Sequence, residues 1–155
     1  MRAAAFILAA FVSLAAHAGG AKLLIKDVPR ASLSKAEAER LEEISRQPGV
    51  GAVVFLGQTN PHALSANAIE MLNGTTVHQF VGTGEDTKDG GRVWAGFSAD
   101  KTERLFLTRS PVGLVGNIAV GGHEFMIRPI GYGGLHAIFV LKRIAMNDEG
   151  ASVKK

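Results

Sequence analysis

The chain has 155 residues, no cysteine and a formal net charge of +3. Without cysteine, the chain cannot form a disulfide framework, a zinc–thiolate site, a thiol nucleophile or the lipid-modified cysteine of a bacterial lipoprotein. The positive charge is small, and no run of basic residues is interleaved with aromatic ones, so the composition does not indicate nucleic-acid binding.

The first 18 residues have the layout of a signal peptide. Arg2 precedes an apolar run over residues 3–16, and the small-x-small triplet Ala16-His17-Ala18 ends it. This run is shorter than the roughly 18 residues that a membrane span needs. We therefore expect cleavage after Ala18, export to the periplasm or the medium, and no membrane attachment after cleavage. Export without any cysteine suits a bacterial protein better than a small eukaryotic secreted domain.

Residues 19–49 are expected to form an N-terminal arm and a helix. Apolar and polar side chains alternate weakly over residues 21–28, and Pro29 ends the pattern. This segment fits either a short strand or a mobile arm. The remaining mature chain is short enough for a single domain, which we place at residues 50–147, followed by a polar tail over residues 148–155.

One amphipathic helix is predicted over residues 34–47. Ser34 and Glu37 have the spacing of a capping box, and a Pro-Gly pair follows the last residue. Leu41 and Ile44 fall on one face, while most of the remaining surface is charged. We expect this helix to contact the domain through few apolar side chains and to expose its charges to solvent.

The β domain is expected to begin with a buried strand over residues 50–56, which are apolar and bounded by glycines. Further on, Asn73-Gly74 is a strong hairpin signal, because both central positions of a type I′ turn need positive φ. We expect strands over residues 68–72 and 75–81. A helix over residues 65–72 is the alternative, since several of these residues are good helix formers.

Residues 82–91 are expected to form an exposed loop, because they contain four glycines and no apolar residue. Glu85, Asp86 and Asp89 could hold calcium, but their spacing lacks the alternation of an EF-hand loop. The glycines could cradle a phosphate, but no Gly-Lys-Ser/Thr follows them. We therefore assign no metal and no cofactor to this segment.

Five short apolar segments follow, separated by polar or glycine-rich breaks. Short connections favour antiparallel neighbours, so these segments predict a β meander. The last one is apolar on both faces, which indicates a central or doubly covered strand. The expected fold class is mainly β (α+β), an antiparallel meander sheet or small sandwich with one N-terminal amphipathic helix. The segments are residues 92–97, 104–108, 114–120, 123–128 and 135–141.

No catalytic centre is recognisable. His123-Glu124 begins like the helical zinc motif His-Glu-x-x-His, but position 127 is isoleucine and the segment is a predicted strand. His78, His123 and His136 lie on three predicted strands, so a three-histidine metal site stays open as an alternative. No serine lies in a Gly-x-Ser-x-Gly elbow. We therefore expect a non-enzymatic protein without a cofactor, in which Trp94 anchors the core.

The meander also carries a succession of short motifs. These are Val93-Trp94-Ala95-Gly96, Leu105-x-Leu107, Gly113 to Ile118, Phe125 to Gly131, and Gly134 to Ile138. Over residues 92–149, this succession resembles the N-terminal propeptide region of secreted bacterial reprolysin-like (M12-type) zinc metalloproteases. The residues that carry the resemblance are structural in kind and have no catalytic role: Trp94, Gly96, Gly116, Ile118, Ile127, Pro129, Gly134 and His136.

The resemblance implies an exported β domain that binds a secreted metalloprotease as an inhibitor or folding assistant. Two features depart from the family: the chain stops where a protease domain would begin, and it has no cysteine to bind the protease zinc. A truncated protease precursor, a stand-alone periplasmic or extracellular binding module, and a small metal-dependent hydrolase built on the histidines are the alternatives.

Overall fold

The computed structural model describes residues 19–73 and 75–142. The predicted signal peptide, the last residues of the predicted β domain and the predicted polar tail lie outside them. The strands are β1 (Ala21–Lys22), β2 (Leu24–Asp27), β3 (Val50–Thr59), β4 (Ala68–Asn73), β5 (Thr76–Asp86), β6 (Arg92–Phe97), β7 (Arg104–Ser110), β8 (Gly113–Val120), β9 (His123–Pro129) and β10 (Leu135–Leu141). The helical segments are η1 (Arg30–Ser32), α1 (Lys35–Ser45) and η2 (Ala63–Ser65).

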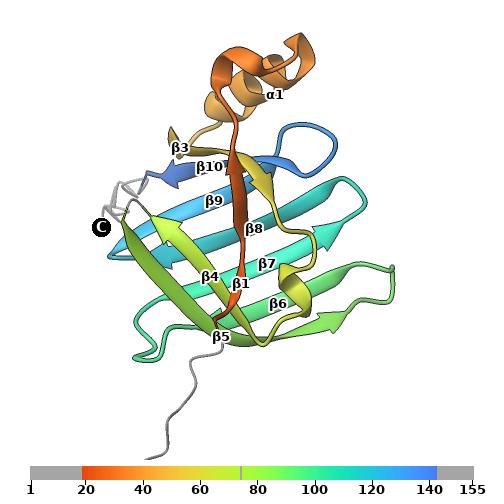
Figure 1. Ribbon diagram of the computed structural model, residues 1–155. Coiled ribbons are helices and arrows are strands. Elements are labelled where there is room, and N and C mark those ends of the chain that lie inside the picture. The colour runs from red at the N-terminus through yellow and green to blue at the C-terminus, as the bar shows by residue number, and fades with distance from the viewer. Residues whose placement is uncertain (1–18, 74, 143–155) are drawn as a thin grey trace, which may run out of the picture.

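The described chain is mainly β with one α-helix, but its sheet is not the simple meander or sandwich that was predicted. The strands form one curled sheet that nearly closes like a barrel, in the order β1-β4-β5-β6-β7-β8-β9-β10-β3-β2 (Figure 1). Only β4 to β10 follow chain order. The prediction failed because β3 pairs with β10, the last described strand of the sequence, and no local pattern specifies such a distant partner.

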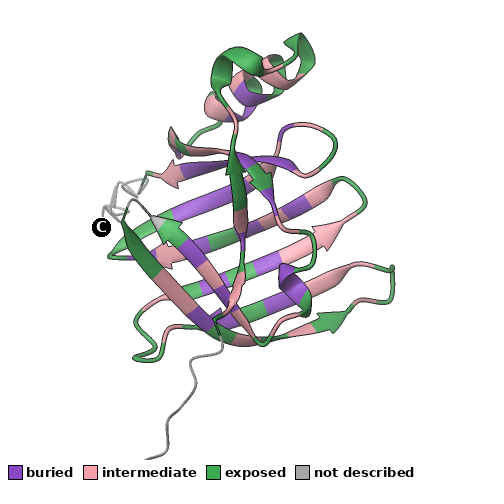
Figure 2. Ribbon diagram, viewed as in Figure 1, coloured by how far each residue is buried: buried purple, intermediate pink, exposed green. Residues whose placement is uncertain are grey.

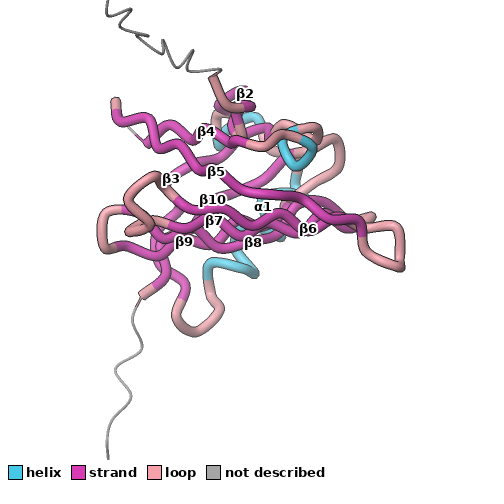
Figure 3. Tube along the Cα trace, turned by 90° about the horizontal axis from the view of Figure 1, so that it is seen from below, coloured by secondary structure: helices cyan, strands magenta, loops and turns pink. Residues whose placement is uncertain are grey.

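Of the short strand and the mobile arm that residues 21–28 left open, the structure shows strand, because this segment belongs to the sheet. β1 pairs in parallel with β4, and β2 pairs antiparallel with β3, so one continuous extended segment joins the two ends of the strand order. It runs across the front of the molecule in Figure 1. Seen from below, the barrel-like sheet is flattened: β4 and β5 form one wall, and β7, β8 and β9 form the opposite wall (Figure 3).

The core lies inside this sheet because apolar residues alternate with polar ones along the strands (Figure 2). In β8, Leu114, Ile118 and Val120 are buried on the inner face, as the alternation predicts. Every described residue from Leu135 to Phe139 is buried, which agrees with the doubly covered last strand. This strand contacts the interior on one side and the α1 cluster on the other.

Helix α1 covers the outer face of β3, β9 and β10. Leu41 and Ile44 are buried there against residues such as Phe139 and Met126. The predicted capping box is present: Glu37 N–H donates to Ser34 Oγ (3.3 Å), and Ser34 N–H donates to Glu37 Oε2 (2.8 Å). The helix does not precede the sheet, however, because it is inserted between β2 and β3.

The predicted hairpin is confirmed and the competing helix is wrong, because β4 and β5 are antiparallel. Asn73, however, was expected in the turn and instead ends β4, where it faces Thr76. The predicted loop over residues 82–91 is too long, since β5 continues to Asp86. Its glycines allow close approach: a Cβ at Gly82 would lie 2.0 Å from Ala95 O. Among the described residues, no helix has the length and apolar character to cross a membrane.

Candidate functional site

Side chains fill the interior of the sheet. Trp94 and Phe80 are fully buried, and the Trp94 Nε1–H donates to Ala66 O at 2.8 Å. A fully buried indole with its N–H bonded to the backbone acts as a core anchor. A candidate site is therefore expected on the outer surface of the sheet.

The most unusual part of that surface is the seam, the side of the molecule where residues 21–27 lie between β3 and β4. Leu23 is fully buried and bridges both strands: its N–H donates to Glu70 O (2.8 Å), and its C=O accepts from Asn60 N–H (2.8 Å). After Leu23 the segment leaves β4 and follows β3, where Val28 N–H donates to Leu56 O (2.8 Å).

A cleft of about 370 Å³ lies where β2 diverges from β4. A smaller hollow of about 30 Å³ shares Leu24, Val54 and Leu72 with this cleft and reaches core side chains such as Phe125. The cleft therefore lies next to the hydrophobic core. Its lining residues are Leu24, Ile25, Lys26, Asp27, Val54, Phe55 and Leu72.

Two strand edges border the seam. In the described parts of the chain, residues 71–73 of β4 pair only with β5, and residues 50–55 of β3 pair only with β10. Unpaired N–H and C=O groups along a strand edge can pair with an added strand. The seam thus combines strand edges with a cleft lined by apolar side chains and by Lys26 and Asp27.

Large apolar side chains project around the cleft. The exposed fractions are 59% for Ile25, 53% for Val54, 57% for Leu72 and 59% for Val77. Leu72 and Val77 are direct partners across the β4–β5 hairpin, so they share one face. Scattered exposed apolar residues need no explanation, but a cluster beside a cleft indicates an interaction surface.

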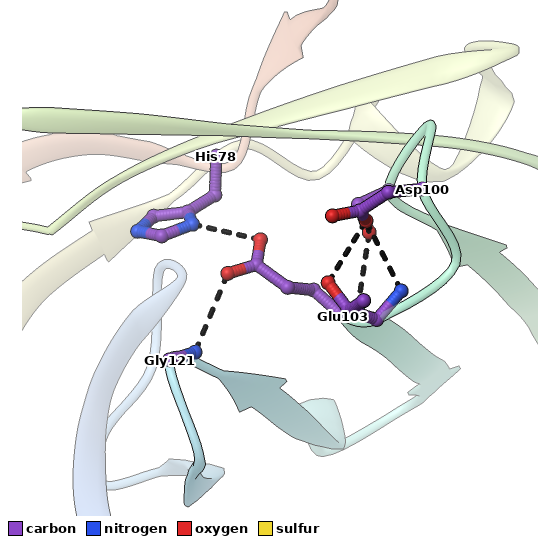
Figure 4. Close-up of polar contacts among 6 residues, drawn as sticks. His78, Asp100, Glu103 and Gly121 are labelled. Carbon is purple, nitrogen blue, oxygen red and sulfur yellow. Dashed lines mark hydrogen bonds and ion pairs between the residues drawn. The ribbon is translucent and has the colours of Figure 1, made fainter.

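A polar contact holds the hairpin that carries Leu72 and Val77. β5 pairs with β6 only from Val81 onward, so its first residues have no strand partner on that side within the described chain. There His78 Nδ1 lies 2.8 Å from Glu103 Oε2, and Glu103 Oε1 accepts from Gly121 N–H at 3.3 Å (Figure 4). This contact ties the hairpin to the β6–β7 loop and the β8–β9 turn.

Asp100 shapes the β6–β7 loop from which Glu103 projects. Its Oδ1 accepts hydrogen bonds from Ser98 Oγ–H (2.6 Å), Thr102 N–H (3.1 Å) and Thr102 Oγ1–H (2.8 Å) (Figure 4). These bonds, led by the one from Ser98, lower the pKa of the exposed Asp100 carboxyl from 3.8 to about 2. The loop therefore keeps its ionised aspartate, and with it the position of Glu103, in mild acid.

His136 lies far from the seam hairpin, at the end of the sheet where β8 begins. Its Nδ1 is 2.7 Å from Gly134 O and 3.0 Å from Thr59 Oγ1, and its Nε2 accepts from Leu114 N–H at 2.8 Å. Burial lowers the pKa of His136 below its ordinary 6.5. A neutral imidazole with both nitrogens bonded joins three segments of the chain, which is a structural role.

The residues that carry the family resemblance fall into two groups. Trp94, Gly96, Gly116, Ile118 and Ile127 are buried on the inner face, where a Cβ at Gly96 would lie 2.3 Å from the Trp94 ring. The others meet at the end of the sheet described above: Pro129 is opposite His136 in the ladder, and Gly134 accepts a bond from that histidine. None of these residues lines the seam cleft.

The structure does not bring the three histidines together. His136 accepts a hydrogen bond from Leu114 N–H near the start of β8. His123, by contrast, follows the end of β8 and is exposed beside Phe125. His78 is engaged with Glu103. Within residues 19–73 and 75–142, no three histidine or carboxylate side chains converge as metal ligands.

A second groove, the end groove, lies near His136. It has a volume of about 510 Å³ and is bordered by α1, the β7–β8 turn and the β9–β10 loop. At the rim of the end groove, Tyr132 is fully exposed and Val112 is 74% exposed. Arg40 contributes a positive charge to the lining and forms an ion pair with Glu43 (2.6 Å).

Sequence reasoning missed the seam. One signal was present: around Asn73-Gly74, apolar residues occupy both faces of the predicted hairpin, with Met71 next to Leu72. Met71 turned out to be buried and Leu72 exposed. Two apolar faces on a hairpin indicate that one of them is available to a partner.

Comparison with protein-family models, curated proteins and solved structures gave no match to this chain.

Proposed function

We propose that this chain is an exported, non-enzymatic module that binds a secreted zinc metalloprotease, either as an inhibitor or as a folding assistant. The seam is the observation that carries this proposal. Two strand edges there flank a cleft of mixed lining, three large exposed apolar side chains (Ile25, Val54 and Leu72) line it, and exposed Val77 lies beside Leu72. The resemblance to a metalloprotease propeptide region suggests the class of partner.

Strand addition is the mode of binding that fits the seam. An extended segment of the partner would pair its main chain with the edge of β4, and alternate side chains would enter the cleft between Leu72 and Val54. Main-chain pairing supplies affinity, while the cleft selects apolar side chains. A bound segment of this kind could block a substrate groove or hold an unfolded strand of the protease during folding.

The test is to mix the mature protein with secreted reprolysin-like zinc metalloproteases from the same source. We expect a complex in gel filtration, together with either a loss of proteolytic activity or a higher yield of refolded protease. Absence of both a complex and any effect on the protease would refute the proposal.

A matched pair of variants locates the contact. Leu72→Lys places a charge beside the cleft and is expected to weaken the Kd at least about tenfold, as loss of a central interface residue does. Val112→Lys makes a similar change at the β7–β8 turn and is expected to leave the Kd unchanged. Near-UV circular dichroism of Trp94 would verify that both variants are folded.

The end groove favours a second candidate, a stand-alone periplasmic or extracellular binding module. Its volume lies within the range of roughly 300–1,000 Å³ typical of small-ligand sites, and exposed Tyr132 offers a flat contact surface. Native mass spectrometry of the purified protein tests this candidate. A bound small molecule that disappears in Tyr132→Ala but persists in Leu72→Lys would favour it over the protease-binding module.

A further inference from the structure

A second group of exposed apolar residues lies on the outer face of β5, β6 and β7. The exposed fractions are 60% for Val81, 52% for Phe97 and 46% for Phe106. Val81 is directly opposite Phe97, and Phe106 is directly opposite the exposed Ala95, two residues along from Phe97. We call these four residues the outer patch.

The outer patch lies on the same face as the hairpin residues of the seam. Val77 and Val81 are both exposed and four residues apart on β5, a distance of roughly 13 Å along a strand. Gln79 and its ladder partner Glu70 lie between them. The two side chains are bonded to each other, since Glu70 Oε1 accepts from Gln79 Nε2 (3.4 Å), and the same oxygen accepts from Gly20 N–H (2.8 Å).

The charges at the border of the outer patch are satisfied. Arg104, the ladder partner of Phe97, forms an ion pair with Glu124 at 2.8 Å. The other border positions, Thr83 and Asn117, are neutral. Covering the outer patch therefore leaves no border charge of that patch unpaired, and an uncharged apolar surface complements the patch.

We propose that the partner is a folded protein that covers the seam and the outer patch in one interface, with an uncharged apolar face beside the strand that it adds. This inference rests on the function proposed above. A standard interface buries about 800 Å² on each partner, which is wide enough to span both apolar groups. An isolated peptide strand would fill the cleft and leave Phe97 and Phe106 in water.

The experiment uses the mature protein and the folded catalytic domain of a secreted reprolysin-like zinc metalloprotease. The double variant Phe97→Ser/Phe106→Ser is expected to weaken the Kd for this domain at least about tenfold. Tyr132→Ser also removes an exposed aromatic ring, but at the end groove, and is expected to bind like the wild type. Leu72→Lys reports separately on the seam.

The outcomes separate the two proposals. If Leu72→Lys weakens binding and the double variant binds like the wild type, the wide interface is wrong and the proposed function stands. If the wild type does not bind the protease, both are overturned. Sedimentation of the wild type as a dimer and of the double variant as a monomer would show that a second copy covers the patch, which also overturns the inference.

A second measurement does not depend on the folding of any variant. Hydroxyl-radical labelling of the wild-type protein modifies exposed phenylalanine rings. We expect labelling of Phe97 and Phe106 to fall severalfold in the complex, while labelling of Tyr132 stays the same. Unchanged labelling of both phenylalanines in a confirmed complex would contradict the wide interface.

Discussion

His136 is held neutral by its surroundings. Protonation of Nε2 would require loss of the bond from Leu114 N–H, and burial disfavours the charged ring. The histidine therefore donates through Nδ1 to Gly134 O and accepts through Nε2, which fixes one tautomer. Its ring connects the β9–β10 loop with the start of β8.

This neutral histidine should make stability depend on pH. Because the pKa of His136 is lower in the folded protein than the ordinary 6.5, the unfolded chain takes up a proton at a higher pH. The stabilisation is complete above about pH 6.5 and is lost as the pH falls towards the lower folded pKa. Urea midpoints measured from pH 8 to pH 5 should decline, and the decline should be smaller in His136→Gln. Equal slopes in the two proteins would contradict this assignment.

Gly96 illustrates how a missing side chain makes room for a large one. A Cβ at this position would lie 2.3 Å from the Trp94 ring and 2.8 Å from Val81 O. Gly96→Ala is therefore expected to lower the free energy of unfolding by about 1–3 kcal/mol through overpacking. Gly19→Ala is the control, because its nearest neighbour is 3.5 Å away, and thermal unfolding of both variants gives the comparison. Similar melting temperatures for the two would refute the steric explanation.

At the scale of elements, helix α1 depends on its first turn. Ser34→Ala removes the acceptor for Glu37 N–H and is expected to cost about 1 kcal/mol in the free energy of unfolding. Ser45→Ala makes the same replacement in the last turn, where Ser45 Oγ–H only donates back to Leu41 O. That control should be close to neutral. Chemical denaturation of both variants tests the capping box, and equal stability would argue against it.

Elements with local signals were predictable. The capping box of α1, the Asn73-Gly74 signal for the β4–β5 hairpin, and Gly121-Gly122 between β8 and β9 each act within a few residues of the chain. Residues 82–86 were misread because glycine usually marks a loop, whereas here it admits a neighbouring strand. Pairing of β3 with β10 and of β1 with β4 has no such local signal, so the nearly closed sheet could not be predicted from the sequence.

The candidate site could not be predicted from the sequence either, because it also depends on pairing between distant strands. The cleft is built from β2, β3 and β4, whose proximity follows only from closure of the sheet. Single residues such as Leu72 are recognisable as apolar in the sequence, but their exposure depends on which face of the hairpin meets the core. By contrast, the core role of Trp94 follows from its type and its strand, and the structure agrees.

For the whole molecule, Leu23 is the residue on which closure depends. It is fully buried between two strands that do not pair with each other. Leu23→Ala is expected to lower the free energy of unfolding by about 2–5 kcal/mol, because it leaves a cavity in the core. Ile25→Ala, at a position that is 59% exposed, should change it by less than about 0.5 kcal/mol. Urea denaturation distinguishes the two, and a small effect at Leu23 would mean that the sheet closes without it.

Closure by residues 21–27 also determines when this chain can finish folding. β1 and β2 are synthesised before their partners, and β3 finds its main partner only when β10 has been made, some 80 positions later in the sequence. Contacts of such high sequence separation favour slow folding. A chain synthesised from its N-terminus must therefore leave the sheet open until β10 has emerged. During that interval the edges of β3 and β4 would be available to any other strand nearby.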